Sequence, residues 1–220
     1  MIEYLQRVPL FSSLDADQLM LILNRCTKKN YQFGTVLFRE KDPGNDFYII
    51  LSGSVKIFTT GANGEEKILS VLNAGDSFGE LALIDGLPRS ASAAAVENSV
   101  MLQLSKSDFL DVLREHFDIT LSIMQELSRR LRETNEHVRD LTFLDSRTRV
   151  LKQLILMANR SGKRVGTQIS LRNVLNYDEL AKMAGVKRDV LLQVLHELRS
   201  KGILSIADDQ FTIDLAKLRN

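Results

Sequence analysis

Between residues 34 and 104, apolar and polar positions alternate in short runs separated by turn residues. The runs TVLF, FYIIL, SVKIF and EKILSVL are divided by DPGND, SG, TTGANG and NAGD, and SVMLQL closes the series. Short strands with frequent turn signals are typical of an antiparallel sandwich or roll. Asn63-Gly64 predicts a hairpin with a type I′ turn, because both residues tolerate a positive φ. A short helix over residues 14–26, beginning near Asp15, precedes this β-rich part.

After residue 104 the apolar period changes from two to nearly four, and Ser105 and Asp108 have the spacing of a capping box. Helices are predicted from there to about residue 144. Within this helical stretch, one set of mostly apolar residues recurs at alternating spacings of three and four, as in a heptad seam: Met124, Leu127, Leu131, Thr134, Val138 and Leu141. Such a seam suits pairing with an identical helix. Taken alone, Thr134, its polar member, tunes the register or is simply tolerated.

The last third of the chain predicts a helix-turn-helix. A helical run, TRVLKQLILMA, leads through a polar loop, SGKRVG, to a capped start formed by Asn176 and Glu179. YDELAKMA then supplies about two turns, Gly185 provides a tight turn, and a second helix runs from about Lys187 to Arg199. ILSI and QFTI flank the turn ADD and predict a hairpin wing.

Charge is divided unevenly along the chain. The total is only +1, from 29 basic and 28 acidic side chains. Residues 1–145 hold 15 basic and 21 acidic side chains, a net charge of −6, whereas residues 146–220 hold 14 and 7, a net charge of +7. A basic final third suggests a polyanionic partner.

Composition excludes several classes of protein. The 220 residues are 44% hydrophobic, enough for a core, and no run approaches the roughly 18 apolar residues of a membrane helix. Glu3 interrupts any signal-like start, so we expect a cytoplasmic protein without membrane contact. With Cys26 as the single cysteine, neither an intrachain disulfide nor the usual iron–sulfur or four-cysteine zinc site is expected. His116, His137 and His196 are scattered without a catalytic motif, so no enzyme and no metal site is predicted.

One segment stands apart from this pattern. Residues 78–95 read FGELALIDGLPRSASAAA, in which Glu80 and Arg89 are a lone acid and a lone base among small and aliphatic neighbours. Small residues can simply mark tight turns, and the two charges can form an ordinary surface ion pair. A binding role requires support from the rest of the chain.

The order of three motifs along the chain gives that support. FGELALIDGLPRSASAAA, RRLRETNEHV and AKMAGVKRDV follow one another as in the cyclic-AMP receptor and fumarate-nitrate regulator (CRP/FNR) family of bacterial transcription factors, which the chain resembles over essentially its whole length. The resemblance implies an α+β fold in three parts. These are a cyclic-nucleotide-binding antiparallel β-roll (a double-stranded β-helix) at 1–116, a dimerisation helix and hinge at 117–145, and a winged helix-turn-helix at 146–220.

Within this family, residues 78–95 look like the phosphate-binding cassette, the name kept for them below. The resemblance implies nucleotide contacts from Gly79, Glu80, Leu81, Arg89, Ser90, Ala91, Thr134 and Asn135. A guanidinium such as that of Arg89 can pair with the phosphate through a planar fork of donors. The carboxylate of Glu80 can accept the ribose 2′-hydroxyl proton, and Gly79 lets the backbone approach the sugar.

The base is expected to meet Thr134 and Asn135. The best-known member of the family has serine at the second position, so Asn135 is a departure. An amide both donates and accepts, so it suits the N6 and N7 edge of adenine but could also meet guanine. Cyclic AMP is therefore the expected effector, with cyclic GMP open.

For DNA, the resemblance implies that the second helix of the motif enters the major groove. Arg188, Asp189 and Gln193 are expected to contact bases. Lys187 and Lys182 are expected to contact phosphates. Val190, Leu192 and Gln193 depart from the family pattern, so no operator is predicted. The implied partners are a two-fold symmetric DNA site, a second copy of the chain and RNA polymerase.

Two alternatives stay open. A regulator of the same fold can sense another effector, such as haem with a gas or a small acid, or can bind DNA constitutively. A nucleotide-binding module can also act on protein partners, as in kinases and channels. The retained Glu80, Arg89, Ser90 and Thr134 disfavour the first alternative, and the basic last third disfavours the second.

Overall fold

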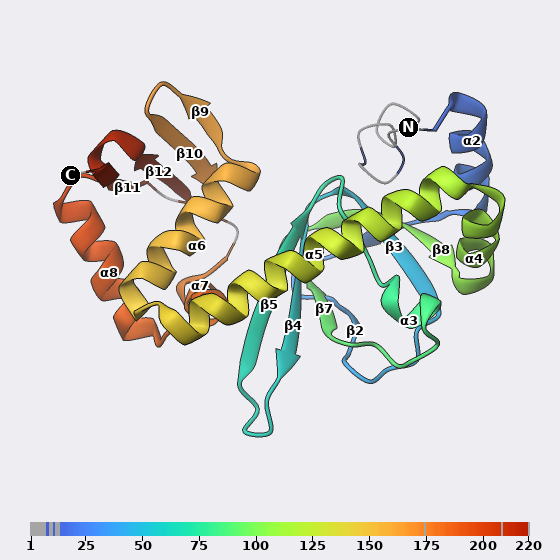
Figure 1. The fold of residues 1–220 in the computed structure, drawn as a ribbon, viewed down its shortest axis with the longest axis horizontal. Coiled ribbons are helices and arrows are strands. Elements are labelled where there is room, and N and C mark those ends of the chain that lie inside the picture. The colour runs from blue at the N-terminus through green and yellow to red at the C-terminus, as the bar shows by residue number, and fades with distance from the viewer. Residues whose placement is uncertain (1–7, 9–10, 12–13, 174, 208, 220) are drawn as a thin grey trace. The chain divides into compact units, whose positions relative to one another are not determined.

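The computed structural model describes residues 8, 11, 14–173, 175–207 and 209–219. By its internal contacts the chain divides into two units, Met1–Thr134 and Asn135–Asn220. Figure 1 shows the first unit as a β-roll with helices, and the second as helices with a small sheet.

The first unit is built on two four-stranded antiparallel sheets, ordered β1-β8-β3-β6 and β2-β7-β4-β5. Their strands are β1 (Thr27–Tyr31), β2 (Val36–Phe38), β3 (Asp46–Ser52), β4 (Ser54–Thr60), β5 (Glu66–Asn73), β6 (Ser77–Phe78), β7 (Ser92–Ala95) and β8 (Ser99–Ser105). The antiparallel roll predicted from the alternating runs is confirmed. The alternation places one set of side chains inside, where Ile50, Val55, Ala93 and Met101 are fully buried.

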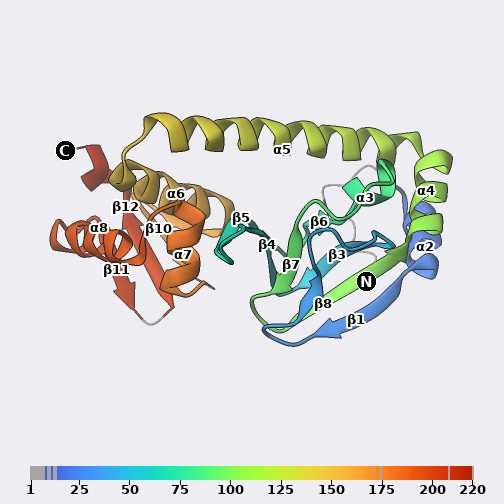
Figure 2. The ribbon, with the colours of Figure 1, turned by 90° about the horizontal axis from the view of Figure 1, so that it is seen from below.

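In the described part of the first unit the sheets are accompanied by α2 (Ala16–Arg25), α3 (Leu81–Ile84), α4 (Lys106–Glu115) and α5 (Phe117–Phe143), the last of which continues beyond Thr134. Helix α2 begins next to Asp15, as predicted, and Asp15 caps it, because its carboxylate accepts the N–H of Gln18 at 2.8 Å. Helices α2 and α4 lie side by side in both views (Figures 1 and 2). Leu19 and Ile22 of α2 join Phe109 of α4 in one buried cluster.

The second unit holds α6 (Ser146–Ser161), β9 (Lys163–Val165), β10 (Gln168–Arg172), α7 (Tyr177–Ala184), α8 (Arg188–Ser200), β11 (Leu204–Ala207), β12 (Gln210–Asp214) and a 3-10 turn, η2 (Leu215–Arg219). Its sheet is antiparallel, in the order β11-β12-β10-β9. Helices α6, α7 and α8 contribute Leu154, Leu180 and Leu191 to one core with Ile169 and Phe211 of the sheet.

Two local predictions were wrong. The polar loop SGKRVG contains an edge strand, β9, whose Arg164 pairs with Ile169 of β10. The hairpin between β4 and β5 forms, but not with a type I′ turn. Gly64 has φ +81°, whereas among the described residues Lys41 is the only non-glycine with a positive φ. The wing between β11 and β12 is present, and Asp208 of its turn lies outside the described residues.

Helix α5 leaves its apolar seam uncovered in the single chain. Met124, Leu131 and Val138 are 58%, 62% and 58% exposed, and Leu141 is 43% exposed. Leu127 packs partly against the core of the first unit. A stripe of exposed apolar side chains along one helix marks an interaction surface.

The turn between β3 and β4 supplies a test of the roll. Gly53 has φ +88°, and a Cβ there would lie 2.6 Å from Ser99 Cα and 2.7 Å from the Asn98 carbonyl oxygen. Gly64 has φ +81° but nothing within 4 Å of its added Cβ. We expect Gly64→Ala to cost about 1–2 kcal/mol from backbone strain alone, and Gly53→Ala to cost about 3 kcal/mol or more because strain and overlap add. Urea unfolding followed by circular dichroism measures both. Equal losses would contradict the steric account.

Candidate functional site

The cassette carries a buried arginine that is bound by main-chain oxygens. Arg89 is only 4% exposed. Its Nη1 donates to the Gly79 carbonyl and its Nη2 to the Asp46 carbonyl, both at 2.7 Å. Its Nε is buried without a hydrogen-bond partner. Among the described residues no carboxylate forms an ion pair with Arg89, so its hydrogen bonds go to main-chain carbonyls, while the charges of Asp46, Glu80 and Asp42 act on it from a greater distance.

Aromatic rings line the same site. The guanidinium carbon of Arg89 lies 4.1 Å from the centre of the Phe38 ring and 6.0 Å from that of Tyr48. Tyr48 in turn stacks on Phe78, with ring centres 5.0 Å apart. A cation over aromatic faces is attracted by their quadrupoles. Burial lowers the pKa of the Arg89 guanidinium from its usual value, which is the cost of placing this charge inside the roll.

Gly79 is needed at this point for two reasons. Its φ of +90° disfavours any residue with a side chain, and an added Cβ would lie 2.8 Å from Arg89 Nη1. The backbone of Arg89 is fixed separately by the loop before β3. The Arg89 N–H donates to the Asp42 carbonyl and the Lys41 N–H donates to the Arg89 carbonyl, both at 2.8 Å. Backbone and side chain of Arg89 are therefore held independently.

Glu80 is buried as well, at 6% exposure, but Arg89 is not its partner. Arg130 of α5 donates from Nη1 to Glu80 Oε1 at 3.2 Å and from Nη2 to the Ser77 carbonyl at 2.5 Å. Burial raises the pKa of the Glu80 carboxyl, and the charge of Arg130 lowers it in part. The alternative of a surface pair between Glu80 and Arg89 is wrong, because both side chains are buried and each has other partners.

Sequence reasoning missed Arg130. The run RRLRE at 129–133 has the charge pattern of a solvated helix face, and Arg129 does follow it by pairing with Glu126 and Glu133. Arg130 instead lies against the cassette while its Nε donates to Glu126 at 2.7 Å. The only sequence signal was the Glu126–Arg130 spacing of four residues, which is common on exposed helices.

The other predicted contacts are placed as follows. Leu81 opens α3 and is 43% exposed, Ser90 is exposed, and Ala91 is buried. The N–H groups of Ser90 and Ala91 are not donors in any loop hydrogen bond of the described residues. Thr134 lies one turn beyond Arg130 on α5, and its hydroxyl donates to the Arg130 carbonyl at 2.9 Å. Asn135 follows it and is exposed.

The second unit contains the predicted helix-turn-helix. Asn176 and Glu179 form both hydrogen bonds of a capping box at the start of α7. Gly185 ends α7 with left-handed φ +66° and ψ +40°, the conformation that favours glycine. Helix α8 then buries one face, and its first turn carries the charged residues. This agrees with the local signals read from the sequence.

Three of the predicted DNA contacts, Lys187, Arg188 and Asp189, lie at the start of α8, with Gln193 one turn further along and Lys182 on α7. Lys187, Arg188, Asp189 and Gln193 are exposed, and Lys182 of α7 is half-buried. Arg188 pairs with Asp178 at 3.4 Å, with both side chains more than half exposed. Such exposed pairs contribute little, so Arg188 is available to another acceptor.

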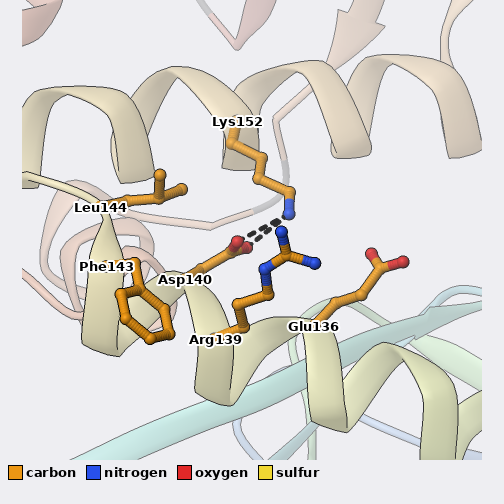
Figure 3. Close-up of a pocket in the computed structure, with 6 residues that line it drawn as sticks. All are labelled: Glu136, Arg139, Asp140, Phe143, Leu144 and Lys152. Atoms are coloured by element: carbon orange, nitrogen blue, oxygen red, sulfur yellow. Dashed lines mark hydrogen bonds and ion pairs between the residues drawn. The ribbon is translucent and has the colours of Figure 1, made fainter.

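The corner between α5 and α6, residues 140–149, is braced by polar contacts. Lys152 binds both oxygens of Asp140, at 2.8 and 2.7 Å, and Figure 3 shows this pair between Arg139 and Leu144. A hollow of about 730 Å³ opens beside it. Arg149 donates to the Leu144 carbonyl at 2.7 Å and to the Gly185 carbonyl at 3.1 Å. The end of α5 is thereby bonded to the turn before α8.

Neither a membrane-spanning helix nor a metal-binding cluster occurs among the described residues. No helix there has the length and apolar character needed to cross a bilayer. No three or more histidine, cysteine, aspartate or glutamate side chains in the described part of the chain are grouped so as to hold a metal ion.

Comparison with known proteins agrees with this geometry. Residues 28–116 match the family described as the cyclic nucleotide-binding domain. The chain is 33% identical to the cyclic AMP receptor protein of Thermus thermophilus over 90% of this chain and 88% of that one. It is 29% identical to the CRP-like cAMP-activated global transcriptional regulator of Mycobacterium tuberculosis over 91% and 89%. It also shares the fold of the c-di-GMP responsive regulator CLP of Xanthomonas campestris, with a TM-score of 0.76, 24% identity and coverage of 90% and 99%.

The network around Arg130 generates a pH prediction. Burial alone would raise the pKa of the Glu126 carboxyl, but hydrogen bonds from Arg129 and Arg130 lower it to about 2. A carboxyl whose pKa is lower in the folded state stabilises the fold above its unfolded pKa and loses this contribution as pH falls through its folded pKa. We therefore expect the unfolding free energy of wild type minus that of Glu126→Gln to be largest near neutrality and to shrink from about pH 5 toward pH 2. Urea unfolding at several pH values measures it. A difference that grows on acidification would contradict the assignment.

Proposed function

Because the chain belongs to the cyclic-AMP receptor and fumarate-nitrate regulator family of bacterial transcription regulators, we propose that it is an effector-gated DNA-binding regulator. A cyclic nucleotide is its effector, and it acts as a homodimer on a two-fold symmetric site. Its place of action is the cytoplasm, where it contacts DNA and RNA polymerase.

The observation that carries the effector site is Arg89. A buried guanidinium is expensive unless an anion compensates it, and among the described residues Arg89 contacts carbonyl oxygens and aromatic rings but forms no ion pair with a carboxylate. Its Nε is an unused donor in the same plane. A single phosphate anion would satisfy that donor and neutralise the charge. The N–H groups of Ser90 and Ala91, which follow directly, add donors to the same cradle.

We assign the rest of the nucleotide to the remaining predicted contacts. Glu80, paired with Arg130, accepts the ribose 2′-hydroxyl, Leu81 covers the sugar beside Gly79, and Thr134 and Asn135 meet the base. Cyclic AMP is the proposed effector, supported by the names of the relatives from Thermus and Mycobacterium. CLP is described as c-di-GMP responsive, so cyclic GMP and other nucleotides belong in the test.

Pairing of the subunits is proposed along α5. The exposed seam at Met124, Leu131 and Val138 supplies the apolar surface. Two copies of α8 would then enter successive major grooves about 34 Å apart, so a small change in α5 packing decides whether both dock. A switch from 1:99 to 99:1 needs about 5.5 kcal/mol of differential affinity, which two nucleotides per dimer can share.

The effector site is tested by substitution of Arg89. We expect Arg89→Ala to weaken cyclic AMP binding about 100-fold or more, because a buried charge-assisted pair is removed. Arg114→Ala is the matched control, since Arg114 is 77% exposed at its side chain and pairs with Asp111 on the same helix. Calorimetric titration with cyclic AMP and cyclic GMP measures both variants. Unchanged affinity in Arg89→Ala, with a folded protein, would refute the site.

DNA reading is tested at α8, after selection of a preferred duplex from a random pool. We expect Arg188→Ala to lose about tenfold in affinity for that duplex and little for unrelated DNA, because arginine reads guanine in the major groove. Arg199→Ala, at the far end of α8, should change both duplexes alike. Binding of the wild type should also weaken steeply as salt rises. Salt-independent binding, or equal loss on both duplexes in Arg188→Ala, would contradict the proposed interface.

A further inference from the structure

Glu126 is bound to two adjacent arginines of α5, and only one of them touches the cassette. Arg129 binds Glu126 through two donors, Nε at 2.9 Å and Nη2 at 2.6 Å. Arg130 donates its Nε to Glu126 Oε1 at 2.7 Å. The side chain of Glu126 is 28% exposed, so these bonds form at the edge of the protein rather than in bulk water. The carboxylate therefore compensates both neighbouring cations at once.

The guanidinium of Arg130 has a different acceptor at each of its three nitrogens. Nε meets Glu126, Nη1 meets Glu80 at 3.2 Å, and Nη2 meets the Ser77 carbonyl at 2.5 Å. Three acceptors in three directions fix both the position and the rotation of a planar fork. Two of them belong to the cassette side, whereas Glu126 anchors the guanidinium to its own helix.

Loss of the third acceptor would leave the other two contacts less well defined. An arginine side chain has several rotatable bonds, and ordering it costs conformational entropy. Glu126 stands four residues before Arg130, the favourable order for an ion pair within a helix. It holds Arg130 extended before any ligand arrives. Arg130 binds Oε1 of Glu80, and the carboxylate can still accept a hydroxyl donor, because its two oxygens offer about four lone-pair sites.

We propose that Glu126 is a positioning residue of the effector site, which acts through Arg130 to aim the carboxylate of Glu80 at the ribose 2′-hydroxyl. This role rests on the proposed cyclic-nucleotide function and adds a residue that never touches the ligand. Its effect is specific to the sugar hydroxyl, because Glu80 is the group that Arg130 holds. The phosphate, bound by Arg89 through separate contacts, should be indifferent to it.

The test compares two ligands that differ by one oxygen. Affinities for cyclic AMP and for 2′-deoxy cyclic AMP are measured by calorimetry on the full chain, and their ratio is the hydroxyl preference. If the wild type binds cyclic GMP more tightly, the cyclic GMP pair is used. We expect Glu126→Gln to reduce the hydroxyl preference about five- to tenfold and to change 2′-deoxy binding less than about twofold. A general loss of helix stability would weaken both ligands equally.

Glu133→Gln is the matched control. Glu133 is also an acid on α5 paired with Arg129, but it makes no contact with Arg130 among the described residues. We expect it to leave the hydroxyl preference unchanged. A double variant, Glu126→Gln with Arg130→Met, should have the same preference as Arg130→Met alone, because the two residues act in series. Thermal melts of all variants confirm that each is folded.

The outcomes are distinguishable. A preference that falls in Glu126→Gln but not in Glu133→Gln, without further loss in the double variant, supports the positioning role. An unchanged preference in Glu126→Gln, an equal fall in Glu133→Gln, or additive losses in the double variant would overturn it while leaving the effector site intact. A wild type that binds neither cyclic AMP nor cyclic GMP would overturn the proposed function and this inference together.

Discussion

The first unit depends on one costly feature, a buried guanidinium without a carboxylate partner among the described residues. Arg89 is placed between two carbonyl oxygens and an aromatic ring, and its backbone is bonded on both sides to the loop before β3. A fold selected only for stability gains little from such a charge, because an apolar side chain of similar size avoids the desolvation penalty. The roll retains it where the chain also leaves backbone donors unused. The neighbouring small residues follow from the same constraint, since Gly79 has no room for a Cβ beside the guanidinium.

The second buried charged group, Glu80, is paired with a charged side chain from another element. Its partner, Arg130, arrives from α5, about fifty positions later in the chain, and is itself balanced by Glu126. The hydrogen bonds of the two side chains thus come from separate sources, main-chain carbonyls for Arg89 and a helix side chain for Glu80. Separate partners matter for binding, because an anion can approach Arg89 without breaking the pair at Glu80. It also ties the sugar-facing part of the cassette to α5.

Features that depend on residues close together in the sequence could be predicted, whereas features that depend on contacts between distant segments could not. The helix start near Asp15, the capped start at Asn176 and the turn at Gly185 involve residues within a few positions, and all three appear as predicted. The strand β1 was missed because TKKNY lacks apolar alternation and is ordered by pairing with β8. The strand β9 was missed for the same reason, because KRV lacks apolar alternation and pairs with β10 at an edge of the second unit's sheet. The partner of Glu80 could not be found locally, because the contact with Arg130 depends on packing between distant segments.

Helix α5 contacts the cassette and also carries the apolar seam, and the two surfaces cannot move independently because they belong to one helix. Arg130 faces the cassette, while the next residue, Leu131, is 62% exposed and belongs to the apolar seam. Successive side chains on a helix differ by about 100° in direction, so a rotation that moves Arg130 also turns Leu131. Thr134 adds a further link, since its hydroxyl is bonded to the Arg130 carbonyl one turn back. A change at Glu80 therefore alters the same helix that offers its apolar stripe to a second subunit, and no separate relay between the two surfaces is required.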